Sequence, residues 1–464
     1  MEKMHITDGE AQEVLNGTEG WIAAICLQMH SFTKEGSFTL TPDTERLVES
    51  AVWMYLTTEE KDFLLLVSIL DGFTERQAAI MLDLDILPES MRRFLKNNYF
   101  IRYFPNKSLF RIHSILKEYL EKRFRNCMTE DYQNHMLHKA GDSCVVESQY
   151  RTAAEFYYRV GDFDAILSLP FSYEYLDSLK DKCQKECIIK LADECPDDIL
   201  CKYPFTLLIF GYHTLGCGHF DLYEKICRLL HDTIQKGMGF NKEELRKING
   251  EYKLLSSMMK FNSLPEMHEI QAEAWKISGQ PSKIVKPETP WIFAAASPFN
   301  VFWRESGELE NELKQLNEYS ALYYKLTNVH GEGYSILMHA EIMVMRGEDD
   351  HAEILCHKAL CAARRFEQVA ICISVELVLG RIAIMRGDVD GYFKAVKNIQ
   401  SYSEVNPSLY VLHMIEYCMS VLSLVLGVKD YVSPWLYDMQ SIREAVYAPV
   451  IPYAQMLHLK LRLM

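Results

Sequence analysis

Positive charge is in short supply in this sequence. It has 49 Lys and Arg residues against 64 Asp and Glu residues, which gives a formal net charge of −15 over 464 residues. DNA and RNA are polyanions, so a chain with that total repels them unless its basic residues are concentrated in one place. Nucleic acid is therefore not expected to be the main partner of this chain.

Long apolar runs and a secretory leader are also lacking. The most apolar stretch near the C-terminal end, 371–385, contains Glu376 and Arg381, and the stretch 419–428 is about half as long as a membrane span requires. The 13 Cys residues, an odd number, are scattered through apolar patterns, which is typical of reduced thiols in a cytosolic protein. We expect a cytoplasmic protein with no membrane partner.

Signatures of catalysis and of nucleotide or metal binding are missing as well. The sequence has no G-x-x-x-x-G-K-S/T loop to hold a triphosphate, no G-x-S-x-G and no H-E-x-x-H. The spacing of Cys183, Cys187, Cys195 and Cys201 does not match a zinc site, so core packing is the favoured interpretation and no metal site is expected. We expect no enzymatic activity and no cofactor on this chain, and an all-helical enzyme is kept only as a third hypothesis.

The sequence does contain a helix and hairpin pattern between residues 41 and 126. Thr57 and Glu60 form a capping box before an apolar helix, Thr74 caps a second helix, and a third is predicted over 88–97. Aromatic and β-branched residues on both sides of the turn 105–107 then predict a β-hairpin. Three helices followed by a hairpin indicate a winged-helix domain over 41–126, preceded by the remnant of a helical domain over 1–40.

A repeat of 40 residues dominates the C-terminal part. Gly347, Gly387 and Gly427 are 40 residues apart, and Asp350, Asp390 and Asp430 follow them at a constant offset, with Gly307 as a weaker fourth copy. Such a period is typical of stacked helical hairpins. We expect each glycine to end a first helix in the left-handed conformation and the acidic side chain to cap the second. The predicted fold is mainly α, with a tetratricopeptide-like α-solenoid arm over 127–464 after the winged helix.

Three segments resemble a known family when taken in order: Thr18-Glu19-Gly20-Trp21 with its following helix, residues 63–73 and residues 110–120. They are similar to the MalT-like branch of the LuxR-type, ATP-dependent transcription regulators of the STAND class, specifically over residues 10–170. The resemblance implies a nucleotide-binding domain, a winged helix, a sensor arm that binds an inducer, and a C-terminal helix-turn-helix. Neither end of this chain shows its part, so we expect a fragment, a truncated reading frame or functions divided between chains.

The resemblance also implies roles for residues of the winged-helix region. His113 and Arg111 correspond to a segment that senses a bound nucleotide, although ATP or ADP would require a nucleotide-binding domain supplied elsewhere. The alternative is a structural histidine. Arg92, Arg93 and Lys96 lie on the third predicted helix within a basic stretch, 89–125, and suit either phosphate or DNA contacts or a face that docks another domain.

A second group of candidates lies in the arm and suits an effector. Aromatic residues with a few polar neighbours are typical of sites for small, neutral or sugar-like ligands, and filling the core between hairpins is the alternative. The candidates are Trp291, Asn300, Trp303, Arg304, His330 and Glu341.

Two functions of different classes remain open. The first is the effector-sensing and relay portion of a MalT-like regulator, which binds a small-molecule inducer or a partner protein on the arm. The alternative is a free-standing protein-interaction scaffold. Self-association is compatible with either function, and DNA is expected as a partner only through the missing C-terminal domain.

Overall fold

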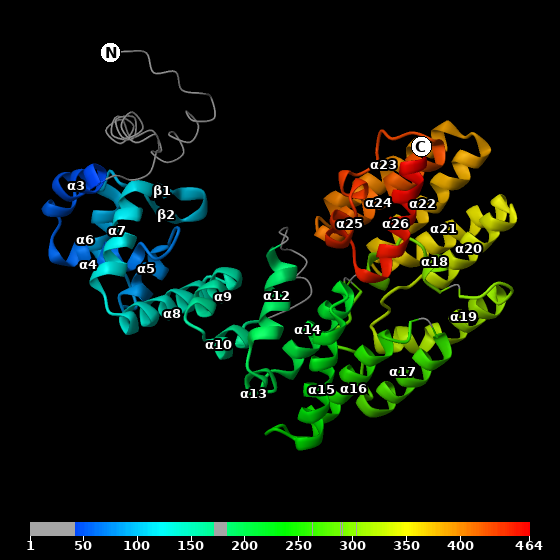
Figure 1. Ribbon diagram of the computed structural model, residues 1–464, viewed down its shortest axis with the longest axis horizontal. Helices are drawn as coiled ribbons and strands as arrows, with labels where there is room; N and C mark the ends of the chain where they lie inside the picture. The colour runs from blue at the N-terminus through cyan, green and yellow to red at the C-terminus, as the bar shows by residue number, and fades with distance from the viewer. Residues whose placement is uncertain (1–41, 171–182, 262, 288, 290, 303) are drawn as a thin grey trace, which may run out of the picture. The chain divides into compact units, whose positions relative to one another are not determined.

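The chain divides into two compact units, residues 1–170 and 171–464. The computed structural model describes residues 42–170, 183–261, 263–287, 289, 291–302 and 304–464, shown as ribbons in Figure 1. The predicted helical remnant over 1–40, with the segment Thr18 to Trp21, lies outside the described residues. Each unit is considered by itself.

The first unit contains the predicted three helices and hairpin. Its capping boxes are confirmed, because Glu60 N donates to Thr57 Oγ1 and Gln77 N to Thr74 Oγ1. The hairpin is confirmed in antiparallel register, with Ile101 opposite Ile112. The elements are α3 (Pro42–Ala51), η1 (Trp53–Tyr55), α4 (Thr58–Val67), α5 (Glu75–Met81), α6 (Glu89–Asn97), β1 (Ile101–Phe104), η2 (Pro105–Lys107), β2 (Leu109–Ile112) and α7 (Ser114–Cys127).

Fully buried aromatic residues hold the hairpin against the helices. Phe73 follows α4, bridges the backbone of Phe110 on β2, and stacks on its ring with 5.9 Å between the centroids. Phe63 on α4 packs edge-on against Phe73. Burying each such ring contributes about 2 kcal/mol, so these three side chains fix the position of the hairpin.

Three further helices belong to the first unit, α8 (Glu130–Val146), α9 (Tyr150–Arg159) and α10 (Phe163–Ser168). The amide of Gln77 on α5 is buried and donates to Gln149 Oε1 at 3.1 Å, just before α9. Lys139 on α8 pairs with Asp83 after α5 at 2.5 Å. These contacts explain why the first unit extends to residue 170, whereas the sequence pattern placed the start of the arm at 127.

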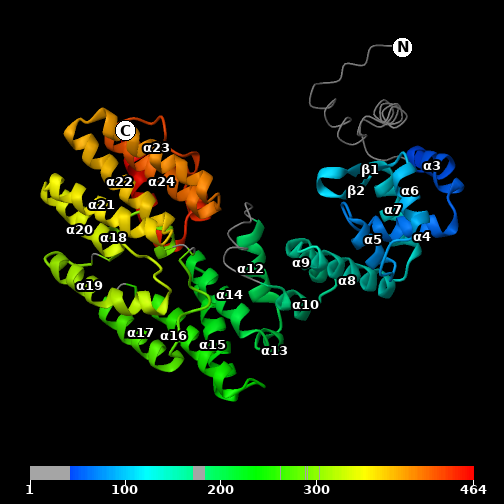
Figure 2. The same ribbon diagram turned by 180° about the vertical axis from the view of Figure 1, so that it is seen from behind.

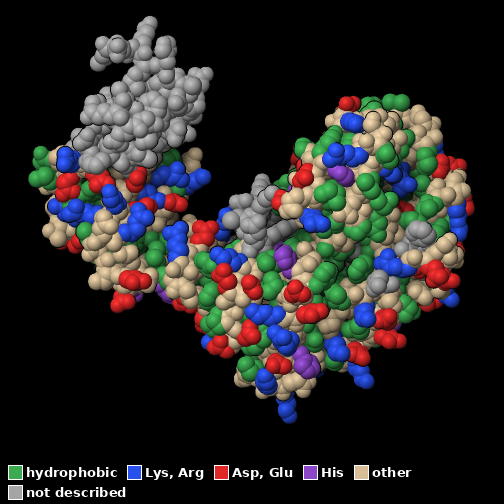
Figure 3. Space-filling view, in the orientation of Figure 1, with side chains coloured by type: hydrophobic (Ala, Val, Ile, Leu, Met, Phe, Trp, Pro, Cys, Tyr) green, Lys and Arg blue, Asp and Glu red, His purple; other side chains and the backbone are tan. Residues whose placement is uncertain are grey.

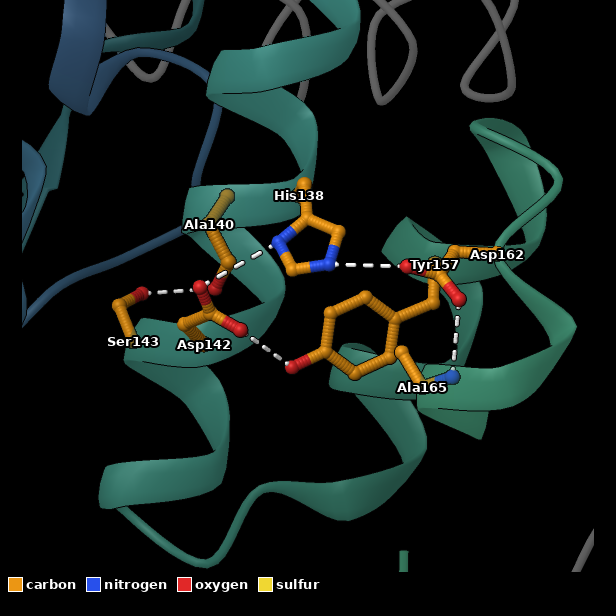
Figure 4. Close-up of polar contacts among 7 residues, drawn as sticks. All are labelled: His138, Ala140, Asp142, Ser143, Tyr157, Asp162 and Ala165. Atoms are coloured by element: carbon orange, nitrogen blue, oxygen red, sulfur yellow. Dashed lines mark hydrogen bonds and ion pairs between the residues drawn. The ribbon is translucent and has the colours of Figure 1, made fainter. Parts of the chain in front are cut away.

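A polar network joins α8 to α9 and α10 (Figure 4). His138 lies between two carboxylates, with Nδ1 3.3 Å from Asp142 Oδ2 and Nε2 3.0 Å from Asp162 Oδ2. Tyr157 donates to Asp142 at 2.8 Å, and Asp162 caps α10 by accepting from the backbone of Ala165. Each ring nitrogen of His138 thus faces a carboxylate oxygen, and the network ties α8 to the start of α10.

The second unit is a stack of antiparallel helical pairs, which confirms the predicted repeat arm (Figures 1 and 2). The pairs are α14 with α15, α16 with α17, α20 with α21, and α22 with α23. Its elements are α12 (Cys183–Glu194), α13 (Asp197–Leu200), α14 (Pro204–Cys217), α15 (Phe220–Lys236), α16 (Lys242–Met258), α17 (Leu264–Ser278), η3 (Trp291–Ala294), α18 (Pro298–Phe302), α19 (Leu309–Leu326), α20 (Tyr334–Arg346), α21 (Asp349–Arg365), α22 (Val369–Arg386), α23 (Val389–Val405), α24 (Leu409–Leu426), η4 (Pro434–Tyr437), α25 (Met439–Ala445), η5 (Ala448–Val450) and α26 (Ile451–Leu463).

The repeated glycines end helices as predicted. Gly347, Gly387 and Gly427 are the left-handed C-caps of α20, α22 and α24, with φ of 75°, 68° and 75°. Gly307 also has a positive φ, 94°. The second helices α19, α21 and α23 begin at Leu309, Asp349 and Val389, two residues after a glycine each time, so they keep the period of 40.

The predicted role of the acidic residues is wrong in detail. Asp350 lies inside the first turn of α21 and pairs with Arg386 at 2.6 Å, and Arg386 also pairs with Glu353 at 2.6 Å. Arg346 pairs with Glu310 in the same way one copy earlier. The acidic residue therefore links neighbouring copies, because the arginine before the next glycine lies within reach of it.

The N-cap position is two residues before the repeated Asp. At this position Asp388 caps α23 with its side chain, whereas Glu348 makes no capping bond to α21. The third copy also departs from the pattern. Leu426 and Phe393 stand at the positions of Arg386 and Glu353, and Pro434 opens a short 3₁₀ helix, so no second helix begins two residues after Gly427.

Helix α24 is the one described helix that is long and apolar enough to cross a membrane by length and composition. Half of that apolar window is buried, and α24 packs against α22, α23 and α26. Packing inside the arm accounts for its apolar character, as for the core helix of a globular array.

Candidate functional site

The second unit contains a cavity among α14, α16, α17, α18, α19 and α20. The connection from α17 to α18 and the residue before η5 complete its wall. The cavity volume is about 100 Å³, and the whole hollow, counting the space open to solvent at its mouth, is about 1050 Å³. The lining residues are Tyr212, His213, Met258, Phe261, Leu264, Met267, His268, Gln271, Val285, Thr289, Trp291, Phe293, Phe302, Leu316, Tyr319, Tyr323, His330, Tyr334 and Tyr447.

Aromatic and aliphatic side chains make up most of the wall, and among the described lining residues there is no Asp, Glu, Lys or Arg. Apolar side chains also gather towards the middle of the arm face seen in Figure 3, with charged side chains towards the rim. A concave, apolar site with a few polar groups is the usual form of a small-molecule site. The cavity therefore suits an uncharged ligand.

Trp291 is a lining residue that the sequence pattern identified. It is 4 % exposed and stacks on Tyr334 with 4.6 Å between the ring centroids. The loop before α20 passes so close that a Cβ on Gly331, which has φ of +80°, would be 2.0 Å from Trp291 Nε1. Gly331 N donates to Gln368 Oε1 at 2.5 Å, so the loop is held from both sides.

His330 also lines the cavity, in a form that leaves neither nitrogen free. Its Nε2 is 3.0 Å from the carbonyl oxygen of Thr289, which can only accept, so Nε2 carries the hydrogen. Nδ1 then accepts from the hydroxyl of Tyr323 at 2.7 Å. Burial lowers the pKa of His330 to about 4, so the ring is neutral at pH 7 and ties the connection between α17 and α18 to α19.

Three other predicted effector residues do not line the cavity. The backbone carbonyl of Asn300 accepts from the hydroxyl of Tyr453. Arg304 donates to the carbonyl of Phe261 at 3.3 Å and covers its ring, and burial lowers the pKa of Arg304. The sixth candidate, Trp303, lies outside the described residues.

The third of these residues, Glu341, is buried on α20. Its Oε2 accepts from the backbone of Phe299 at 2.9 Å, so it holds α18 against α20. Burial raises its pKa to about 7, against hydrogen bonds from Ser297 and Phe299 that lower it. Glu341 therefore has a structural contact and no access to the cavity.

Two lining residues on α17 escaped the sequence analysis. Gln271 is 3 % exposed, and among the described residues its side-chain amide makes no hydrogen bond. His268 stacks on Tyr319 with 4.1 Å between the ring centroids, and its buried Nδ1 has no hydrogen-bond partner. The available signal was the spacing of Leu264, Met267, His268 and Gln271, which puts polar groups on the apolar face of one helix.

The predicted sites of the first unit are less closed. Arg92 pairs with Glu75 at 3.1 Å and with Glu89 at 3.7 Å, so carboxylates partly neutralise the basic patch. Arg93 and Lys96 are exposed on α6. His113 is half-buried, packs edge-on against Phe100, and donates its backbone N–H to the carbonyl of Phe100. Arg111 is exposed and lies over the ring of Phe104.

Comparison with known protein families finds a match within the first unit. The family described as the MalT winged helix domain matches residues 49–132, the part that contains α4 to α7 and the hairpin. Residues 49–132 are therefore similar to a MalT winged helix domain. The predicted resemblance to MalT-like regulators is thereby confirmed for this region.

Two further comparisons cover the whole chain. No curated protein matches the sequence. Among solved structures, the chain is similar to a Signal Transduction ATPase with Numerous Domains from Pyrococcus horikoshii, which has a tetratricopeptide repeat sensor. The two are 13 % identical, with a TM-score of 0.42, and the match covers 98 % of this chain and 70 % of that one. The nucleotide-sensing roles of His113 and Arg111 in the MalT winged helix domain stay predictions.

Proposed function

We propose that this chain is the effector-sensing and relay portion of a MalT-like, LuxR-type transcription regulator, and that the arm takes a small-molecule effector into its cavity. The observation that carries the proposal is a MalT winged helix domain on the same chain as a helical arm with an apolar cavity. A ligand in the cavity would touch six helices and the connection from α17 to α18. It would therefore favour one packing of these elements over others, as an effector must.

The winged helix domain would pass that change on to a nucleotide-binding domain supplied elsewhere, where ATP or ADP would bind. DNA would be read by a separate module in the cytoplasm. We propose a role without catalysis for this arm. His330 has both nitrogens engaged, the described lining residues include no carboxylate, and His268 has an Nδ1 without a partner but no described carboxylate beside it in the cavity wall.

A ligand screen with a blocked variant tests the proposal. Metabolites would be screened by thermal shift, where a ligand at 100 times its Kd adds about 2.7 kcal/mol. Met267→Trp, which places an indole in the cavity, is expected to abolish the shift. Met439→Trp, at an exposed position of α25, should keep the thermal shift.

The relay is measured separately by hydrogen exchange of the backbone amides of α4 to α7. A bound effector is expected to change exchange in this first unit as well as around the cavity. A ligand that occupies the cavity and leaves α4 to α7 unchanged would show that the arm binds without signalling to the winged helix domain, and the sensing function would be rejected.

Protein binding, either to a partner or to a second copy, is a second candidate supported by a different observation. Where Arg386 pairs with Glu353, the next copy has Leu426 and Phe393, which are 45 % and 58 % exposed. Exposed apolar side chains in place of an ion pair are typical of protein contact surfaces. Analytical ultracentrifugation of the wild type and of Phe393→Glu measures self-association, and equal sedimentation as a monomer would exclude a second copy as the occupant.

A further inference from the structure

The side-chain amide of Gln271 lines the cavity, one turn along α17 from the unpartnered Nδ1 of His268. It is buried at 3 % exposure in the middle of α17, yet it makes no hydrogen bond with the described residues. Leaving such a group unsatisfied costs about 1–3 kcal/mol, and buried amides in native proteins nearly always have a partner. Since Gln271 lines a cavity that opens to solvent, its amide bonds either to water or to a ligand there, and a ligand must replace the hydrogen bonds of that water.

An amide presents two groups side by side, an N–H donor and a carbonyl acceptor. It is fully satisfied by one ligand edge that has an acceptor next to a donor, as in a carboxamide or a lactam. Glutamine recognises adenine through such a paired edge in nucleic acids. A ligand with a single acceptor would leave the carbonyl of Gln271 without a partner.

The surroundings of Gln271 favour a flat ligand. His268, one turn earlier on α17, stacks on Tyr319 at an interplanar angle of 13°, and Trp291 stacks on Tyr334 at 29°. Aromatic walls favour planar guests through offset stacking. Met258 and Met267 add flexible side chains that adapt to the outline of a guest.

Charge and size narrow the class further. The described lining residues include no Asp, Glu, Lys or Arg, so a carboxylate or ammonium group would lose its hydration without gaining one of these as a counterion. The cavity volume of about 100 Å³ is smaller than the about 150 Å³ of engineered cavities that hold benzene, and the hollow widens to about 1050 Å³ when the space at its mouth is counted. A ligand of one ring therefore fits with its polar substituent extending into the wider part of the hollow.

We propose that the cavity binds an uncharged, planar molecule of one aromatic ring that carries adjacent hydrogen-bond donor and acceptor groups, and that Gln271 recognises this edge. The proposal rests on the proposed function and gives the chemical class of the effector. His268 and Tyr319 form one wall against the ring of the ligand.

The test uses four probe molecules with the full chain: benzamide, the lactam 2-pyridone, benzoate and acetophenone. Binding is measured by saturation-transfer NMR and titration calorimetry. Benzamide and 2-pyridone are expected to bind. Benzoate should bind at least about tenfold more weakly because it is charged, and acetophenone about tenfold more weakly because it has only an acceptor.

Two variants connect the binding to the amide. Gln271→Leu is expected to weaken the binding of benzamide about tenfold and to leave the binding of acetophenone almost unchanged. Gln400→Leu, at an exposed position on α23, is the matched control and should bind all four probes like the wild type. Circular dichroism with thermal unfolding verifies that both variants fold.

Equal affinities for benzamide and benzoate, or an unchanged benzamide affinity in Gln271→Leu, would overturn the proposal. So would the absence of binding by benzamide and 2-pyridone. Different results would reject the proposed function. It is rejected if no ligand gives a thermal shift that Met267→Trp abolishes, or if a bound ligand leaves the hydrogen exchange of α4 to α7 unchanged. A ligand of another class that binds wild type and not Met267→Trp would retain the function and reject this ligand class.

Discussion

Two regions of the arm, the stacked helices from α19 to α23 and the helices around the cavity, differ in how their polar side chains are paired. Between α19 and α23, Arg386 pairs with two acidic residues of the previous copy, and the helix-ending glycines face open space. Around the cavity, Gln271 has no partner and the packed rings leave room. The repeated residues therefore serve stacking, whereas the residues without a counterpart in the other copies make the candidate site.

The largest expected loss of stability comes from a glycine near the cavity, and a glycine of the repeat is its comparison. Gly331→Ala combines a positive φ with a collision against Trp291 and should destabilise the arm by about 3 kcal/mol or more. Gly347→Ala has a similar φ but nothing within 4 Å of the added Cβ, so it should cost only about 1–2 kcal/mol. Urea unfolding measures both. Equal losses would mean that the packing of Trp291 contributes nothing specific.

A second test concerns Glu341, a buried carboxyl in the stacked half. Its pKa is about 7 in the folded chain against 4.5 for a free side chain, so protonation favours the fold. The contribution of Glu341 to the free energy of unfolding is complete below pH 4.5. It falls by roughly 3 kcal/mol as the pH rises through 7. Glu341→Gln should therefore gain stability relative to wild type between pH 5 and 8, as measured by urea unfolding at each pH.

The exposed Glu404→Gln is the control for that experiment and should follow the wild type at every pH. His330 acts in the opposite direction, because its lowered pKa gives a contribution that is present above pH 6.5 and lost as the pH falls through 4. If the free energy of unfolding changed between pH 5 and pH 8 by the same amount in the wild type and in Glu341→Gln, the buried position of Glu341 would be contradicted.

The smallest effect is expected at the ion pairs between copies. Arg386→Leu copies the residue found at Leu426 and removes contacts to Asp350, which is fully exposed, and to Glu353. Exposed ion pairs contribute about 0–1 kcal/mol, so the loss should be below about 1 kcal/mol and should shrink further in 0.5 M salt. A larger loss by thermal unfolding would mean that these pairs, and not apolar packing, hold the copies together.

Much of the fold was predictable because its signals are local. Thr57 with Glu60, Thr74, and the turn at 105–107 act within a few residues of one another, so the sequence predicts the winged helix correctly. The glycine period predicts the stacked pairs for the same reason. The partner of Asp350 was not predictable, because Arg386 is brought to it only by the packing of α21 against α22.

The candidate site was predictable only in part. Trp291 and His330 stand out in the sequence as unusual residues at a helix junction, and both line the cavity. Gln271 and His268 do not, because an amphipathic helix with polar residues on its apolar face cannot be distinguished from one that faces solvent until its neighbours are known. The same part of the sequence contains Asn300, Arg304 and Glu341. These residues contact Tyr453, Phe261 and Phe299, and they do not line the cavity.

The constant interval between the starts of α19, α21 and α23 has a consequence for how such an arm changes length. Residues 349–388 could be excised as one block, since Glu348 would then precede Val389 in the setting that Asp388 occupies now. The splice would join a left-handed glycine to the start of a helix, as in the parent chain. Arms of different reach could therefore arise from one ancestor by gain or loss of whole forty-residue blocks. Loss of this block would also remove Gln368, so the loop at Gly331 would need a new partner.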